Sequence, residues 1–362
     1  MTTTLRSPVL LGVILAAGCS NGHSSPPSMA KSETPAAALP PAAPALAVRG
    51  IDLPGATADG VYMDYLAYDR AGHRVWVPAG NTGSVDVIDT RSDTLTRIDG
   101  FPTAEMERRG KKRTVGPSSA TVGDGVVYVG NRADSKVCAI DAATLKLAGC
   151  TQLASMPDGL QYVARTREVW VTTPRDNTVT ILDVSDPRTP KAKTVLHLEG
   201  QPEGFAVDEP RGVFYTNFED KDRTLTLDLA SKQVTRTWEP HCGEDGPKGI
   251  AVDHASNQVL VACADHVVVL DAEHGGAELA RIDTGDGVDD IGYVEARHEV
   301  FVGAARAGKL TVARLDPAAH TLTAVAVVPT ADGARNAVAT EDGVAYLTDA
   351  REGKILVVEP VR

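Results

Sequence analysis

The sequence reads Val169-Trp170-Val171 and then Val179-Thr180-Ile181-Leu182-Asp183, a hydrophobic triplet followed by a second apolar run that ends in an acid. This pair of segments recurs seven times from residue 75 to the C-terminus, and the central residues of the triplets lie 52, 42, 44, 46, 41 and 45 positions apart. The other triplets are Val75-Trp76-Val77, Val127-Tyr128-Val129, Val213-Phe214-Tyr215, Val259-Leu260-Val261, Val300-Phe301-Val302 and Ala345-Tyr346-Leu347. A repeat of roughly 40 to 50 residues built from short β-patterned runs predicts propeller blades, which bury their faces by stacking on one another.

Each repeat contains two further runs of alternating character. The first strand reads Gly204-Phe205-Ala206-Val207-Asp208 in one repeat, and the polar outer strand reads Thr94-Leu95-Thr96-Arg97-Ile98 in another. The seventh repeat ends after its third strand, whereas residues 46–53 form a strand-like run ahead of the first repeat. We therefore predict an all-β fold, a seven-bladed β-propeller of four-stranded blades over residues 45–362, whose ring is closed by an N-terminal strand that completes the last blade.

The segments resemble those of YVTN-type β-propeller repeats over residues 45–362. The closest local matches are Tyr128-Val129-Gly130-Asn131, Phe214-Tyr215-Thr216-Asn217, Pro202-Glu203-Gly204-Phe205 and Pro247-Lys248-Gly249-Ile250. Repeats six and seven depart from the pattern, with Val302-Gly303-Ala304 and Leu347-Thr348-Asp349 in place of Tyr-Val-x-Asn. The resemblance implies the propeller fold, but it leaves activity open because related propellers include binding proteins, scaffolds and a few enzymes.

The first 44 residues have the composition of a targeting segment and a spacer. Arg6 precedes an apolar run over residues 9–17 that is shorter than the roughly 20 residues of a membrane-spanning helix. The segment Ala16-Ala17-Gly18-Cys19 resembles a bacterial lipobox, with Ala16 where leucine is usual. We expect a lipoprotein-type signal peptide over 1–18, lipidation at Cys19, a Ser/Pro/Ala-rich tether over 19–44 and an envelope location facing the periplasm, with the outer membrane favoured by Ser20. A simply secreted protein is the alternative.

Four cysteines remain once Cys19 is set aside, and an even number suits an oxidising compartment. Cys138 and Cys150 lie symmetrically about a turn and are predicted to face one another across a hairpin. Cys242 and Cys263 lie in loops that open on the same face and form the second predicted pair. Four unpaired thiols are the alternative; a metal site is less expected because there is no Cys-x-x-Cys pair.

The loops that join the fourth strand of one blade to the first strand of the next converge on the channel, so we expect a ligand there. They carry polar residues at equivalent positions: Asp64, Ser118, Asp158, Glu203, Lys248, Asp289, Asp290, Arg335 and Asn336. Converging carboxylates can coordinate Ca²⁺ or Mg²⁺ or act as acids and bases. The cations among them favour the alternative of a structural ring of ion pairs. Catalytic residues and cofactors are not otherwise indicated, and no hydrolase, zinc-protease, haem or nucleotide motif occurs.

An insertion lengthens the first repeat and is strongly basic. It carries Arg108, Arg109, Lys111, Lys112 and Arg113, five cations within six residues, on the channel face. These residues are candidates for binding a polyanion. A solvated loop, or one that folds over the acidic ring, is the alternative. No aromatic residues for base stacking accompany the cations, and the formal net charge is −12, so nucleic acid is not the expected partner.

The repeated acids that close each third strand, from Asp89 to Glu359, precede turns, where a short carboxylate accepts backbone N–H bonds. We therefore assign them to turn capping. The function we favour is a non-catalytic, monomeric binding or scaffold module that presents its loop face to a protein, glycan or small-molecule ligand and meets the membrane only through its lipid anchor. The alternative is a divalent-cation-dependent lactonase or lyase that uses Asp158, Glu203, Asp289 and Asn336.

Overall fold

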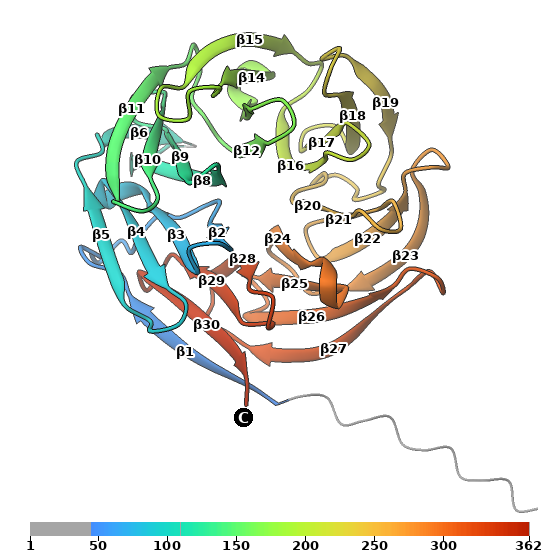
Figure 1. Cartoon of the computed structure of the whole chain (residues 1–362). Helices are drawn as coiled ribbons and strands as arrows, with labels where there is room; N and C mark the ends of the chain where they lie inside the picture. Colours follow the sequence, from blue (N-terminus) through green and yellow to red (C-terminus); the bar gives the residue numbers. More distant parts are fainter. Residues whose placement is uncertain (1–44, 109, 362) are drawn as a thin grey trace, which may run out of the picture. The chain divides into compact units, whose positions relative to one another are not determined.

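The computed structural model describes residues 45–108 and 110–361. These residues form seven four-stranded antiparallel sheets, arranged as blades around a central channel (Figure 1). From the channel outward, blade 1 consists of β2 (Ala67–Asp69), β3 (Arg74–Ala79), β4 (Ser84–Asp89) and β5 (Leu95–Asp99), and blade 2 of β8 (Pro117–Gly123), β9 (Val126–Asn131), β10 (Lys136–Asp141) and β11 (Lys146–Gln152). Blade 3 consists of β12 (Leu160–Val163), β13 (Glu168–Thr173), β14 (Thr178–Asp183) and β15 (Lys191–His197). Blade 4 consists of β16 (Pro202–Asp208), β17 (Val213–Phe218), β18 (Arg223–Asp228) and β19 (Val234–Trp238).

Blade 5 consists of β20 (Ile250–Asp253), β21 (Gln258–Ala262), β22 (His266–Asp271) and β23 (Ala277–Asp283). Blade 6 consists of β24 (Val288–Val294), β25 (Glu299–Ala304), β26 (Lys309–Asp316) and β27 (Thr321–Pro329). Blade 7 consists of β28 (Ala334–Ala339), β29 (Ala345–Asp349), β30 (Lys354–Pro360) and, as its outer strand, β1 (Leu46–Asp52). A two-stranded hairpin, β6 (Ala104–Arg108) and β7 (Lys111–Val115), and the short 3-10 helices η1 (Gly80–Thr82), η2 (Pro174–Asp176) and η3 (Glu295–Arg297) complete the described elements. None of the helices described is long and apolar enough to cross a membrane.

The first strand closes the ring, as the sequence predicts. Strand β1 lies antiparallel to β30, with Leu46 opposite Pro360 and Asp52 opposite Lys354 (Figure 1). The backbone N–H of Val61 also donates a hydrogen bond to a carbonyl of blade 7, at 2.8 Å. The last blade thus takes its outer strand from the opposite end of the chain, which leaves no open sheet edge between blades 7 and 1.

The core lies between the blades. In the described part of the chain there are seven hydrophobic clusters, and each of them joins residues of two neighbouring blades. The triplet of blade 1 shows how this arises. Trp76 packs in the cluster shared with blade 2, whereas Val75 and Val77 pack in the cluster shared with blade 7. Because successive side chains of a strand point to opposite faces, one triplet serves two interfaces.

The glycines of the Pro-x-Gly segments are required by crowding near the channel. A Cβ on Gly204 would lie 2.0 Å from the carbonyl oxygen of Lys248, and one on Gly249 would lie 2.7 Å from the Cα of Asp290. Neither contact is possible for a larger residue without moving the backbone. The innermost strands of blades 4, 5 and 6 therefore approach so closely that only glycine fits, which explains why the repeat begins with this motif.

Both predicted disulfides are present. Cys138 and Cys150 face each other in the register of β10 and β11, with their Cα atoms 4.0 Å apart. Cys242 bonds Cys263, with Cα atoms 5.1 Å apart, and links the loop that enters blade 5 to the end of β21. Both predicted pairings are confirmed.

The repeated acids cap turns in six of the seven blades described. Asp89 accepts the backbone N–H groups of Arg91 and Ser92, both at 3.0 Å. The equivalent bonds are made by Asp141, Asp183, Asp228, Asp271 and Asp316. The assignment is wrong for the seventh acid: Glu359 accepts a hydrogen bond from Arg49 of β1 at 3.3 Å. Glu359 lies opposite Ala47 of β1, because the fourth strand of that blade comes from the N-terminal side of the chain.

Candidate functional site

The channel opens at one end into a cavity of about 760 Å³, which we call the channel mouth. Two kinds of segment line it: the connections from the outer strand of one blade to the inner strand of the next, together with the first residues of that inner strand, and the loops joining the second and third strands of a blade. Ser118, Glu203, Asp289 and Arg335, expected in loops, lie at the starts of inner strands. Both kinds reach the same end of the ring because neighbouring strands in a blade run antiparallel. All seven blades contribute to the lining, so the mouth is a property of the complete ring.

Seven of the nine predicted ligand-binding residues line the channel mouth: Asp64, Ser118, Asp158, Glu203, Lys248, Asp289 and Arg335. Asp290 and Asn336 do not, although each directly follows a lining residue. The Asn336 side chain instead accepts the backbone N–H of Asp290 at 2.9 Å and donates to the carboxylate of Asp64 at 3.0 Å. The Asn336 side chain thus links the segment of Asp289 and Asp290 to the loop of Asp64 behind the cavity lining.

The sequence reasoning missed a second set of lining residues. Loops between second and third strands contribute Arg132, Arg175, Glu219 and Arg306. Only the loops between blades were expected to carry ligand-binding residues, whereas the antiparallel order of the strands places these loops and the loops between second and third strands at the same end of the ring. A signal was available, because Arg132 directly follows the Tyr-Val-Gly-Asn segment of its repeat.

Arg132 is the centre of the best-defined ion-pair network in the mouth. Its guanidinium lies 2.7 Å from the carboxylate of Asp64, in the loop entering blade 1, and also pairs with Asp158, in the loop entering blade 3. The neighbouring side chain of Asn131 donates to the carbonyl of Pro102 at 3.1 Å and accepts the N–H of Ala133 at 2.9 Å. The loop is thereby fixed, and one cation holds three blades together.

Two further ion pairs lie on the opposite wall. Arg335 pairs with Asp289 at 2.8 Å, and Lys248 lies 3.4 Å from Glu219. The predicted ring of polar residues is thus largely a set of cation–carboxylate pairs, in line with the structural alternative raised by the sequence. Pairing lowers the cost of burying these charges, but it does not account for every carboxylate in the mouth.

Asp158 and Glu203 lack full partners among the residues described. Asp158 is only 6% exposed; one of its oxygens pairs with Arg132, while the other, Oδ2, is buried without a hydrogen bond. Glu203 is half-buried and accepts only a 3.3 Å hydrogen bond from the neutral hydroxyl of Tyr65, with no lysine or arginine of the described chain at ion-pair distance. The hydroxyl of Ser118 is likewise buried and unpartnered. Unmet hydrogen-bonding capacity is therefore concentrated on one side of the mouth.

Asp158 and Glu203 also have the most strongly raised pKa values among the carboxylates that line the mouth. Burial raises the pKa of Asp158 to about 6, and the charge of Arg132 only partly offsets this effect. The pKa of Glu203 lies well above its usual range, first because of burial and then because of the nearby charge of Asp158. Burial also raises the pKa of Asp290 to about 8. Perturbed acids gathered in a cleft are a physical indication of a functional site.

Two aromatic rings lie across the channel next to Glu203. Tyr65 of blade 1 and Phe205 of blade 4 have ring centroids 5.2 Å apart. Phe205 follows Glu203 by two residues on β16 and packs against the hydrophobic cluster between blades 3 and 4. The two rings bring the first and fourth blades into contact, and the hydroxyl of Tyr65 joins this contact to the carboxylate of Glu203.

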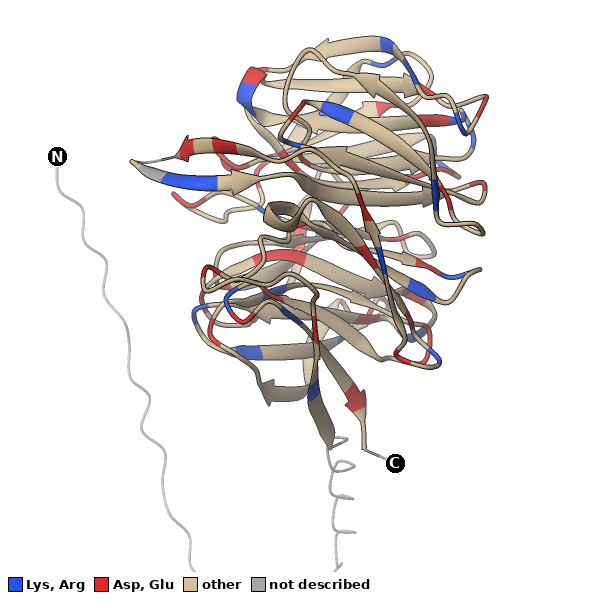
Figure 2. Ribbon diagram, turned by 90° about the vertical axis from the view of Figure 1, so that its left-hand side faces the viewer, with Lys and Arg blue, Asp and Glu red and all other residues tan. Residues whose placement is uncertain are grey.

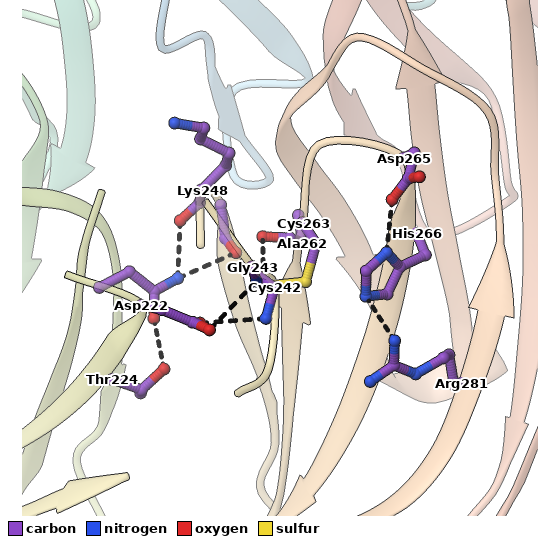
Figure 3. The surroundings of a disulfide bond; sticks show 12 residues. Asp222, Thr224, Cys242, Gly243, Lys248, Ala262, Cys263, Asp265, His266 and Arg281 are labelled. Atoms are coloured by element: carbon purple, nitrogen blue, oxygen red, sulfur yellow. Dashed lines mark hydrogen bonds and ion pairs between the residues drawn. A yellow bond between two sulfur atoms is a disulfide. The ribbon is translucent and has the colours of Figure 1, made fainter. Parts of the chain in front are cut away.

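The second disulfide fixes one loop of the mouth (Figure 3). Cys242 is bonded to Cys263, and the carboxylate of Asp222 accepts the backbone N–H of Cys242 at 3.0 Å. Further along the same loop, the N–H of Lys248 donates to the carbonyl of Ala262 at 2.7 Å. The loop is thus held at both ends of residues 242–248, which positions the Lys248 side chain at the mouth.

The basic insertion forms a β-hairpin that projects beyond the blades (Figure 2). The guanidinium of Arg113 lies 5.1 Å from the ring centroid of Tyr62, and both residues line the mouth. Lys112 lies 3.6 Å from Glu105 of the facing strand. Arg109 and the side chains of Arg108 and Lys111 lie outside the described residues. Two of the five predicted polyanion-binding residues are thus placed, and one of them belongs to the channel mouth.

A metal centre finds no ligand set in residues 45–108 and 110–361, which contain no group of three or more His, Cys, Asp or Glu side chains that could hold a metal ion. Asp289, an expected ligand of the catalytic alternative, is paired with Arg335. In the Gly-rich loop before β24, Asp286 is paired with Arg306. These carboxylates are occupied by cations of the protein itself.

Comparison with solved structures finds propellers of low sequence similarity. A chain of the mitotic checkpoint complex is 16% identical with a TM-score of 0.69, covering 86% of this chain and 93% of that one. Hydrazine synthase from Kuenenia stuttgartiensis is 13% identical with a TM-score of 0.68, covering 84% and 96%. A catalytically inactive variant of virginiamycin B lyase from Staphylococcus aureus, with quinupristin, is 12% identical with a TM-score of 0.66, covering 88% and 100%.

No protein-family model and no curated protein matches the sequence. The similar structures include a lyase and a component of a protein complex, and at such low identities their likeness concerns the fold. The chain has the architecture of a seven-bladed β-propeller that elsewhere carries both binding and catalysis.

Proposed function

We propose that this protein is a non-catalytic binding module whose channel mouth holds a small polar ligand. The observation that carries the proposal is a cavity of about 760 Å³, lined by all seven blades, in which buried polar groups of Ser118 and Asp158 have no partner within the described chain. This volume lies in the usual range of ligand sites, roughly 300–1,000 Å³. Buried polar groups are normally hydrogen-bonded, and a bound ligand would supply the missing partners.

The rigidity of the surrounding wall supports the same function. The Arg132 network ties three blades together, the disulfide at Cys242 fixes the loop of Lys248, and the ring of blades is closed by β1. A site held in this way loses little conformational entropy when a ligand binds. The projecting β6–β7 hairpin adds a rim on which a larger partner, such as a protein or glycan, can also rest.

The two disulfides are typical of a protein that functions outside the cytoplasm. We place the propeller in the bacterial envelope, on a tether over 19–44 and a lipid on Cys19, or in secreted form. The signal peptide, Cys19 and the tether lie outside the described residues, and this part of the proposal rests on their sequence. The lactonase or lyase alternative is the weaker one, because its expected carboxylates do not form a metal ligand set.

The proposed function is tested by screening small sugars, carboxylates and amines for an increase in melting temperature. Two partly exposed alanines of the lining, Ala264 and Ala305, allow the cavity to be filled without touching the charged network. We expect Ala264→Trp and Ala305→Trp each to abolish the shift seen with a mouth ligand. Ala230→Trp, at an exposed turn on the opposite face, should preserve it. A ligand that binds all three variants equally would place the binding site elsewhere.

A further inference from the structure

Within the proposed binding function, we propose that Asp158 and Glu203 recognise a protonated amine on the ligand. Asp158 comes from the loop entering blade 3 and Glu203 from the start of β16 in blade 4, and both line the channel mouth. The other lining acids named above have a cation of the protein as partner: Asp64 has Arg132, Asp289 has Arg335 and Glu219 has Lys248. Glu203 and the second oxygen of Asp158 have no cationic partner among the described residues.

The arrangement fits a cation better than an anion or a neutral group. Asp158 Oδ2 and Glu203 are acceptors when ionised; Arg132 donates through Nη2 to the other oxygen of Asp158, with its Nε left without a partner, and Tyr65 donates to Glu203. An ammonium group carries three donors and no acceptor, so it would satisfy both carboxylates at once through charge-assisted bonds. The buried hydroxyl of Ser118 can accept a further bond.

The rest of the mouth supports a small organic cation. The hydroxyl of Tyr65 donates to Glu203 at 3.3 Å, and the ring of Tyr65 packs on Phe205, so apolar side chains lie behind this carboxylate and leave its remaining acceptor capacity to a ligand. A bare metal ion is a poorer fit, because the described residues offer no group of three or more metal-ligating side chains. A primary amine needs only two or three acceptors, which is what this part of the site provides.

The proton balance of binding provides an independent sign of the site. Burial and neighbouring charge hold the pKa of Glu203 well above its usual range, so Glu203 keeps its proton to a higher pH than an exposed glutamate does. A bound ammonium favours the carboxylate, so its binding displaces a proton into solvent. The charged and titratable groups around the pair are Tyr65, Asp64, Arg132, Glu219, Asp289 and Arg335.

The test uses three four-carbon probes that differ in their end groups: 1,4-diaminobutane, 1,4-butanediol and succinate. Calorimetric titration of the purified protein should show binding of the diamine only, with proton release in buffers of different ionisation enthalpy. Glu203→Gln keeps the shape and the hydrogen bond to Tyr65, and it should weaken the diamine about tenfold or more, as expected for the loss of a charge-assisted bond. Glu273→Gln, an exposed turn residue on the opposite face, is the matched control and should bind as the unchanged protein does.

Three results would overturn the inference: equal binding of the diol and the diamine, undiminished diamine binding in Glu203→Gln, or diamine binding without release of protons. Asp158→Asn provides a second variant should Glu203→Gln fail to fold, with the same loss expected. If only sugars or carboxylates bind, and the tryptophan variants of the lining block them, the binding function stands and the amine assignment falls. If nothing binds in the mouth, both proposals fall.

Discussion

The repeated turn acids and the carboxylates of the channel mouth are the same residue types in opposite surroundings. Asp89, Asp183 and Asp228 have lowered pKa values, chiefly because each accepts backbone N–H bonds within its own turn. Asp158 and Glu203 have raised pKa values because they are buried beside other carboxylates. The comparison teaches that in this protein the conspicuous, periodic acids stabilise the fold, whereas the acids placed in energetically unfavourable surroundings mark the site.

The largest expected effect comes from removing the cation of the mouth. Arg132→Met leaves the carboxylates of Asp64 and Asp158 buried without their partner, and we expect it to lower the free energy of unfolding by about 3–5 kcal/mol at neutral to alkaline pH. Urea unfolding measures the loss. The loss should be smaller near pH 5, because Asp158 can then take up a proton.

The matched control is Arg188→Met. Arg188 pairs with the turn acid Asp141 on the solvent-exposed surface. This variant should unfold at the urea concentration of the unchanged protein, since exposed pairs contribute little. An equal decrease in the free energy of unfolding in both variants would contradict the proposed difference between ion pairs at the channel mouth and ion pairs at the turns.

Removing each disulfide in turn tests whether the loop at the channel mouth is held more rigidly than a surface hairpin. Replacing Cys242 and Cys263 by serine, or Cys138 and Cys150 by serine, should in either case cost about 2–4 kcal/mol of stability. Only the first double variant should increase hydrogen–deuterium exchange over residues 239–249, because only that bond fixes a loop of the mouth. The second serves as the control; increased exchange of the same loop in both variants would contradict a local role.

The smallest expected effect concerns pH. Burial raises the pKa of Asp290 from its usual 3.8 to about 8 in the folded protein. The folded protein therefore binds more protons than the unfolded chain between these pH values, and its stability falls as pH rises through them. Asp290→Asn should therefore leave stability unchanged near pH 3, below both pKa values, and increase it by roughly 1–3 kcal/mol near pH 9. Urea melts across this range measure the difference.

Asp89→Asn is the opposite case. The lowered pKa of Asp89 stabilises the protein above the unfolded pKa, and that contribution is lost as pH falls through the folded value. This variant should lose stability at neutral pH and differ least from the unchanged protein in acid. A gain at alkaline pH in both variants would show that the two acids do not differ.

The candidate site was predictable in part. The repeat places Asp64, Asp158, Glu203 and the other equivalent residues at one end of the ring, and seven of the nine do line the cavity. Asp289 and Asp290 are consecutive, and the chain turns only the first toward the cavity. No count of loop positions distinguishes them, because β24 is irregular between residues 288 and 291.

Pairing between charges was not predictable. Arg132 lies 68 residues from Asp64 and 26 from Asp158 along the chain, and the three meet only once the blades are assembled. The same holds for the contact of Tyr65 with Phe205, which joins the first and fourth blades across the channel. Long side chains and loop conformations decide such contacts, and neither has a periodic signature.

The amino-acid sequence alone is enough to predict the blades, the turn acids and both disulfides, because each depends on neighbours within one repeat or on a regular alternation of side chains. The tertiary structure is needed to tell paired carboxylates from unpaired ones, because the free energy of a buried charge depends on groups brought together from several blades. Glu203 shows the difference: its position in the repeat is regular, whereas its lack of a cationic partner emerges only in the folded ring.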